Sequence, residues 1–74
     1  MVHSEIKINT EFIKLDQLLK FSRVAESGGD AKEMVLSEMV FVNGEPCSMR
    51  GKKIRAGDVV RVEFEDETVE LKVL

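Results

Sequence analysis

The chain is short and acidic, with 74 residues, a formal net charge of −3 and 43% hydrophobic residues. A domain of this length buries only about 60 to 65% of its unfolded surface, which leaves little room for an enclosed catalytic pocket. No apolar run approaches the roughly 20 residues of a membrane span, and the N-terminus lacks the apolar stretch of a signal peptide. We therefore expect one domain, residues 1–74, in a soluble cytoplasmic protein, and its single cysteine, Cys47, agrees with a reducing compartment.

The first part of the chain predicts a strand followed by a helix. Alternation of Ile6 and Ile8 with polar residues indicates a strand over residues 5–9, followed by a connector over residues 10–13. Apolar residues then recur at a helical spacing of three and four, which predicts a helix over residues 14–23. The stripe of this helix consists of Leu15, Leu18, Leu19 and Ser22.

A second helix is predicted over residues 28–38. Ser27 and Asp30 have the spacing of a capping box, in which the Ser hydroxyl accepts from a helical N–H and the Asp carboxylate reaches back. The apolar stripe of this helix consists of Ala31, Met34, Val35 and Met39.

The rest of the chain is predicted to be β structure. Asn43-Gly44 supplies the two positive φ angles of a type I′ turn between strands 40–42 and 45–48, and Pro46 favours a sheet edge for the second strand. Further elements follow in order: a turn at residues 55–58, a strand at 59–64, a turn at 65–68 and a strand at 69–73. We expect an α+β fold in which two short antiparallel helices pack on a small, mostly antiparallel twisted β-sheet.

Side chains for catalysis or metal binding are scarce. The only imidazole is His3, the only thiol is Cys47, and no serine has a base partner at a recognisable spacing. We therefore expect no enzyme activity, no cofactor and no metal site. Gly28 and Gly29 lack the companion residues of a P-loop. They either give flexibility at the start of the second helix or, with Lys32, let that helix end bind a backbone phosphate.

Charge is segregated along the chain. Residues 50–61 hold five basic residues and one acid, a local charge of +4, whereas residues 62–74 carry −4. A positive patch attracts phosphates, and a Debye length of about 8 Å keeps a distant acidic turn from cancelling it. The acidic stretch at 63–67 is either a solvated strand end or a charge that repels nucleic acid and so orients it.

Five segments occur in an order that is typical of one family. They are Lys14-Leu15-Asp16-Gln17-Leu18-Leu19, Ser27 with Ala31-Lys32, Val40-Phe41-Val42-Asn43-Gly44-Glu45, Arg50-Gly51-Lys52-Lys53-Ile54 and Ala56-Gly57-Asp58-Val59-Val60. Together they resemble the RNA-binding domain named after ribosomal protein S4, also called the alpha-L motif, over a motif core of residues 14–62. The chain looks like the small stand-alone bacterial members, of the YaaA and YbcJ type. It departs from the pattern at Glu38, where the family has a helix-ending Gly, and at Met49, which replaces a basic residue.

The resemblance implies docking on structured RNA, either ribosomal RNA or tRNA, possible contact with ribosomal particles, and a role in ribosome assembly or translation. We expect a monomer without a membrane or small-molecule partner. Phosphate contacts are predicted for the basic residues of the two helices and the loop, with Gly51 letting the loop backbone approach the RNA. These basic residues are Lys14, Lys20, Arg23, Lys32, Arg50, Lys52, Lys53 and Arg55.

Aromatic residues do not form a cluster that resembles the stacking platforms of single-strand binders, so recognition mainly by RNA shape is predicted. We expect the four aromatic side chains to lie in the core. They are Phe12, Phe21, Phe41 and Phe64.

An alternative is a small protein-interaction module related to the ubiquitin-like sulfur carriers. Those carriers share a Val-Asn-Gly-Glu hairpin and a Gly-Asp-x-Val turn, but they need a C-terminal Gly-Gly, whereas this sequence ends in Glu70-Leu71-Lys72-Val73-Leu74. The ending argues against carrier chemistry and leaves protein binding without RNA as the competing hypothesis.

Overall fold

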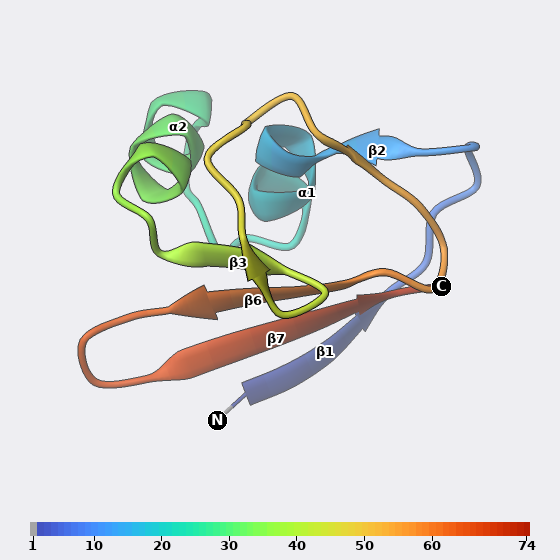
Figure 1. The fold of residues 1–74 in the computed structure, drawn as a ribbon. Helices are drawn as coiled ribbons and strands as arrows, with labels where there is room; N and C mark the ends of the chain where they lie inside the picture. The colour runs from blue at the N-terminus through green and yellow to red at the C-terminus, as the bar shows by residue number, and fades with distance from the viewer. Residues whose placement is uncertain (1) are drawn as a thin grey trace.

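Residues 2–74 are described by a computed structural model, in which two helices cover one face of a five-stranded sheet (Figure 1). The elements in chain order are β1 Val2–Ile6, β2 Ile13–Lys14, α1 Leu15–Phe21, α2 Gly28–Leu36, β3 Val40–Val42, β4 Glu45–Pro46, β5 Lys53–Ile54, β6 Val59–Glu63 and β7 Thr68–Val73. The strand order of the large sheet is β1-β7-β6-β3-β4, while β2 pairs with β5 in a separate two-stranded sheet. The predicted α+β fold is confirmed. Neither helix within residues 2–74 has the length and apolarity to cross a membrane.

The large sheet is antiparallel except at one edge, where β1 runs parallel to β7. The register places Val2 opposite Val69 and Ile6 opposite Val73. The first strand therefore begins and ends earlier than the predicted range 5–9. The sequence pattern did not show its start, because Ser4 interrupts the apolar alternation on the inner face of the strand. The two-residue strand β2 also occupies the end of the predicted connector.

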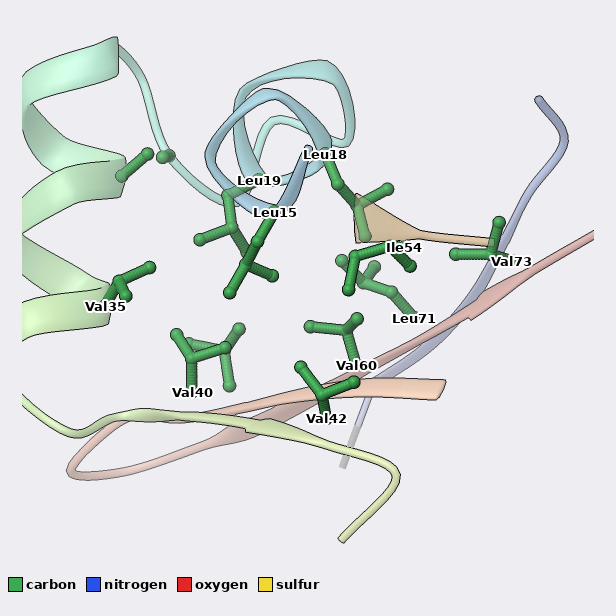
Figure 2. Close-up of a cluster of buried hydrophobic side chains, with 13 residues drawn as sticks. Leu15, Leu18, Leu19, Val35, Val40, Val42, Ile54, Val60, Leu71 and Val73 are labelled. Carbon is green, nitrogen blue, oxygen red and sulfur yellow. The ribbon is translucent and has the colours of Figure 1, made fainter. Parts of the chain in front are cut away.

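The core between the helices and the sheet is aliphatic (Figure 2). The predicted leucine stripe of α1 is buried there against valines of β3, β6 and β7. The prediction that the four phenylalanines lie in the core is wrong: Phe21 is 64% exposed, Phe12 and Phe41 are half-buried outside the core cluster, and Phe64 packs only at its margin. Phe21 lies outside the buried stripe of α1, on the solvent side of Leu18, and strand alternation puts Phe41 on the outer face of the sheet.

Both helices are slightly shorter than predicted and end through a residue in the left-handed region. The hydroxyl of Ser27 accepts from the Asp30 N–H at 3.2 Å, which confirms the first bond of the predicted capping box. At the other end of α2, Glu38 has φ 62°. The N–H groups of Glu38 and Met39 each lie 3.3 Å from a carbonyl of the last helical turn, as in a Schellman motif. The helix therefore ends without the glycine that the family has at this position, and Glu38 itself takes the left-handed conformation.

The predicted β3–β4 hairpin is confirmed. Asn43 and Gly44 have φ 52° and 85°, as a type I′ turn requires. β4 lies at the edge of the sheet, where the missing N–H of Pro46 costs no ladder bond. The strand ends at Pro46 rather than at residue 48.

Candidate nucleic-acid interface

The basic loop, residues 50–55, is bound by its backbone to the first turn of α1. The Leu15 N–H donates to the Lys52 carbonyl at 2.8 Å, and the Asp16 N–H donates to the Arg50 carbonyl at 3.0 Å. The first N–H groups of a helix have no partner within the helix, so the loop satisfies two of them. The loop and α1 therefore form one unit although they are far apart in the sequence (Figure 1).

A two-stranded ladder adds Lys14 to this unit. Strands β2 and β5 pair antiparallel, with Ile13 opposite Ile54 and Lys14 opposite Lys53. Ile54 is fully buried and anchors the loop, while the two lysines are exposed. The Lys53 ammonium lies 4.9 Å from the centre of the Phe12 ring, a cation–π contact that favours one direction of this side chain.

The turn after the basic loop is held by Asp58. Its carboxylate accepts from the Arg55 N–H at 2.8 Å and from the Asn43 side-chain amide at 3.1 Å. The side-chain oxygen of Asn43 accepts from the Val59 N–H at 2.9 Å, which ties the β3–β4 hairpin to the start of β6. The bond from the Arg55 N–H is the main cause that lowers the pKa of Asp58, and the Asn43 bond and the charges of Lys52 and Arg55 add to it against the opposing effect of burial. Asn43 and Asp58 therefore position the loop.

All nine predicted contact residues are exposed. Within residues 2–74 the ion pairs are His3–Glu70 and Arg61–Glu63, so no acid pairs with any of the eight predicted phosphate contacts. Five of the nine gather around the first turn of α1 through the contacts above: Lys14, Arg50, Gly51, Lys52 and Lys53. The structure thus brings one strand end, one helix start and one loop into a single positive surface.

The other predicted contacts lie further out. Arg55 follows the loop into the turn held by Asp58. Lys20 lies in the last turn of α1, about 9 Å along the helix axis from Lys14, and Arg23 follows just after the helix ends. Lys32 is exposed on α2, and no backbone hydrogen bond joins α2 to the basic loop in the part of the chain that the structure describes. The surface is therefore centred on α1 and the loop.

Arg61 belongs to a different face of the molecule. Its neighbours Val60 and Val62 are buried under the helices, so alternation places Arg61 on the outer face of the sheet. Its Nε lies 3.1 Å from a carboxylate oxygen of Glu63, and its guanidinium lies 4.7 Å from the centre of the Phe41 ring. The basic stretch that is continuous in the sequence is thus divided between two faces.

The acidic turn lies away from the basic loop. β6 separates the turn at 55–58 from the acidic stretch at 63–67, and its five residues span about 17 Å. Figure 1 shows the β6–β7 turn at the end of the sheet opposite the C-terminus. This separation exceeds the Debye length of about 8 Å at physiological salt, so the charge segregation of the sequence persists in the fold.

Two features of the loop were not evident from its charge. A Cβ added at Gly51 would meet no atom within 4 Å, so the loop backbone is open to an approaching ligand there. A hollow of about 230 Å³ lies between the loop and the β3–β4 hairpin, with Pro46, Met49 and Lys52 among its lining residues. The Met49 side chain is 67% exposed. Sequence analysis identified neither Met49 nor Phe12 as part of this surface, and the only signal at Met49 was its departure from the family pattern.

The imidazole of His3 and the thiol of Cys47 each contact another polar group of the protein. His3 pairs with Glu70 at 3.1 Å, and the Cys47 thiol lies 3.7 Å from the Met49 carbonyl oxygen. Among residues 2–74, no three side chains of His, Cys, Asp or Glu are arranged to hold a metal ion.

Residues 6–72 match the family model of the S4 domain. The chain belongs to the S4-domain family. The probable ribosome maturation protein RlbA of Bacillus subtilis (strain 168) is 48% identical to this chain over 58 residues, which cover 78% of this chain and 82% of that protein. The suspected resemblance to this family is thereby confirmed, and it extends beyond the motif core of residues 14–62 into β1 and β7.

Proposed function

We propose that this protein binds structured RNA, that its target is ribosomal RNA, and that it acts in ribosome assembly or translation. The observation that carries the proposal is the exposed positive surface that β2, α1 and the basic loop form together, on which no basic side chain of residues 2–74 is paired with an acid. Membership of the S4-domain family and the similarity to a probable ribosome maturation protein support the choice of RNA and of the ribosome.

The proposed contacts follow the shape of this surface. Lys14, Arg50, Lys52 and Lys53 bind phosphates around the first turn of α1, where an exposed Gly51 lets the backbone come close. The remaining proposed contacts extend the surface along α1, into the turn and onto α2: Lys20, Arg23, Arg55 and Lys32. Because the loop is fixed to the helix by two backbone bonds, these charges are held in place before RNA arrives, which favours recognition of a folded shape.

We further propose that residues 1–74 act as one cytoplasmic RNA-binding unit. In this function the protein binds as a monomer and catalyses no reaction.

Charge reversal tests the location of the site. The double variant Arg50→Glu with Lys53→Glu is expected to abolish most RNA binding while leaving the far-UV circular dichroism spectrum and the melting temperature close to wild type, because both side chains are exposed. Reversal of Glu65 and Glu67 to Lys is the matched control, since it changes the same number of charges at the acidic turn. Unchanged RNA affinity in the loop variant would refute the proposed site.

Salt dependence tests the mechanism. If the four basic residues around the first turn of α1 neutralise four phosphates, log affinity falls against log salt with a slope near −3, a loss of ~50-fold from about 50 to about 200 mM salt. Nonspecific RNA should then bind with a Kd of about 10⁻⁴ to 10⁻⁶ M, and the structured RNA target of the protein should bind more tightly. Cosedimentation with ribosomal particles should be reversed by high salt. Cosedimentation that survives both high salt and loop reversal would instead favour the protein-interaction hypothesis.

A further inference from the structure

Phe21 is an aromatic side chain on the proposed RNA surface that has no role in the core. Phe21 ends α1 and is 64% exposed, whereas Leu15, Leu18 and Leu19 of the same helix are fully buried. An exposed Phe gains little from burial and has a lower helix propensity than Lys, Gln or Glu. Folding therefore does not require an aromatic residue at this position.

The position of Phe21 on the helix relates it to the basic surface. Gln17 and Phe21 are four residues apart and form one exposed line along α1, and Lys14, the extended residue that precedes the helix, lies at the N-terminal end of α1. Figure 2 shows Leu18 on the side of α1 next to Ile54 of β5, while Leu19 lies toward α2. Since Phe21 follows Leu18 by three residues, this line runs along the β5 side of the helix.

The N-terminal end of the line brings two lysines together. Lys14 and Lys53 are directly opposite each other in the β2–β5 ladder. Like charges at opposed positions repel, and in residues 2–74 neither lysine has an acid partner. A bound phosphate would relieve this repulsion. The exposed line thus has an aromatic ring at one end and an unneutralised pair of ammonium groups at the other.

We propose that this line holds an unpaired nucleotide stretch of the RNA, with a base stacked on Phe21 and the adjoining phosphates on Lys14 and Lys53. The two ends are about 10 Å apart along the helix axis, a distance that a short single-stranded stretch spans. Base stacking on an aromatic face is independent of sequence because every base has such a face. The inference rests on the proposed RNA-binding function and specifies its target: a folded RNA with an unpaired base beside a helix, rather than a fully paired duplex.

Two matched RNA probes test this inference. One is a short hairpin with a single bulged adenosine, and the other is the same hairpin without the bulge. Wild type is expected to bind the bulged hairpin about 5- to 150-fold more tightly, the range for one stacked base. A bulged 2-aminopurine provides a second readout, because its fluorescence changes on stacking and the protein has no Trp or Tyr to obscure the signal.

Three variants separate stacking from other effects. Phe21→Ala should lose the preference for the bulge and the 2-aminopurine change while still binding the paired hairpin, and Phe21→Tyr, which keeps the ring, should retain both. Leu36→Ala is the control, since Leu36 is a 58% exposed apolar residue of α2. Its substitution should change neither readout.

The outcomes distinguish this inference from the function on which it rests. If wild type binds both hairpins equally, with an affinity that depends on salt and on the loop charges, the stacking inference is wrong and the proposed RNA-binding function stands. If Phe21→Ala retains the preference, Phe21 is not the stacking residue. If wild type binds neither hairpin even at low salt, both proposals fail.

Discussion

Removal of the Asp58 carboxylate is expected to destabilise the hydrogen-bonded contact between the β3–β4 hairpin and the basic loop. Asp58→Ala deletes the acceptor of two hydrogen bonds, one from the Arg55 N–H at 2.8 Å and one from the Asn43 amide at 3.1 Å. Bonds to charged groups contribute about 1.5 to 3 kcal/mol when buried, and water partly replaces these because Asp58 is only half-buried. At about 1 kcal/mol each, the variant should lose about 2 kcal/mol of unfolding free energy, or ~8 to 16 °C in melting temperature.

Urea unfolding followed by far-UV circular dichroism measures this loss, since the chain has no Trp or Tyr for fluorescence. Asp58→Asn is the matched variant, because it keeps one side-chain acceptor oxygen without the charge. It should lose about half as much stability as Asp58→Ala.

The pH dependence follows from the direction of the pKa shift. The Arg55 N–H bond, with the smaller effects described above, lowers the pKa of Asp58 in the folded state relative to an unfolded value near 3.9. The carboxylate therefore contributes its full stability well above about pH 4, and this contribution disappears as pH falls through the folded pKa. The difference between wild type and Asp58→Asn should be constant from about pH 6 to 8 and shrink below about pH 4. A loss below about 0.5 kcal/mol in Asp58→Ala, or a difference that does not change in acid, would refute this reasoning.

Three other substitutions probe the backbone. Glu38→Gly should stabilise the fold by about 0.5 to 1 kcal/mol in urea unfolding. The left-handed conformation at φ 62° costs a residue with a side chain roughly 1 to 2 kcal/mol, and the greater freedom of glycine in the unfolded state offsets only part of the gain from removing this cost. A less stable variant would contradict the assignment of this helix end. Gly51→Ala should change stability by less than about 0.5 kcal/mol, since its Cβ meets open space, yet weaken RNA binding if the backbone touches RNA there. Gly57→Ala, at φ 97°, is the contrasting variant and should destabilise by about 1 kcal/mol or more.

Local sequence patterns were sufficient to predict the two helices and the β3–β4 hairpin. The helical spacing of the leucines in α1 placed them in the core, where all three are fully buried. Asn43-Gly44 specified its turn because few other residue pairs accept two positive φ angles. These features depend on residues within one or two turns of each other, so the sequence alone determined them.

Pairings between distant segments required the tertiary structure. The parallel contact of β1 with β7 joins the two ends of the chain, and the β2–β5 ladder has two residues on each side, too few to show a period. The burial of the phenylalanines was also undetermined, because hydrophobicity favours burial without specifying which side of an element meets the core. Phe21 faces solvent because it lies outside the buried leucine stripe of α1.

The candidate site divides in the same way. Charge and family resemblance selected the basic residues, since composition and short motifs are properties of the sequence. Their assembly was decided by contacts that the sequence does not encode locally: the Arg50 and Lys52 carbonyls cap α1, and Lys14 stands opposite Lys53. Arg61 belongs to the same charged stretch but lies on the other face of the sheet, paired with Glu63. The net charge of a segment does not depend on where its side chains point, whereas a binding surface requires them to point to the same face of the molecule. That face is fixed only when the strands and helices pack.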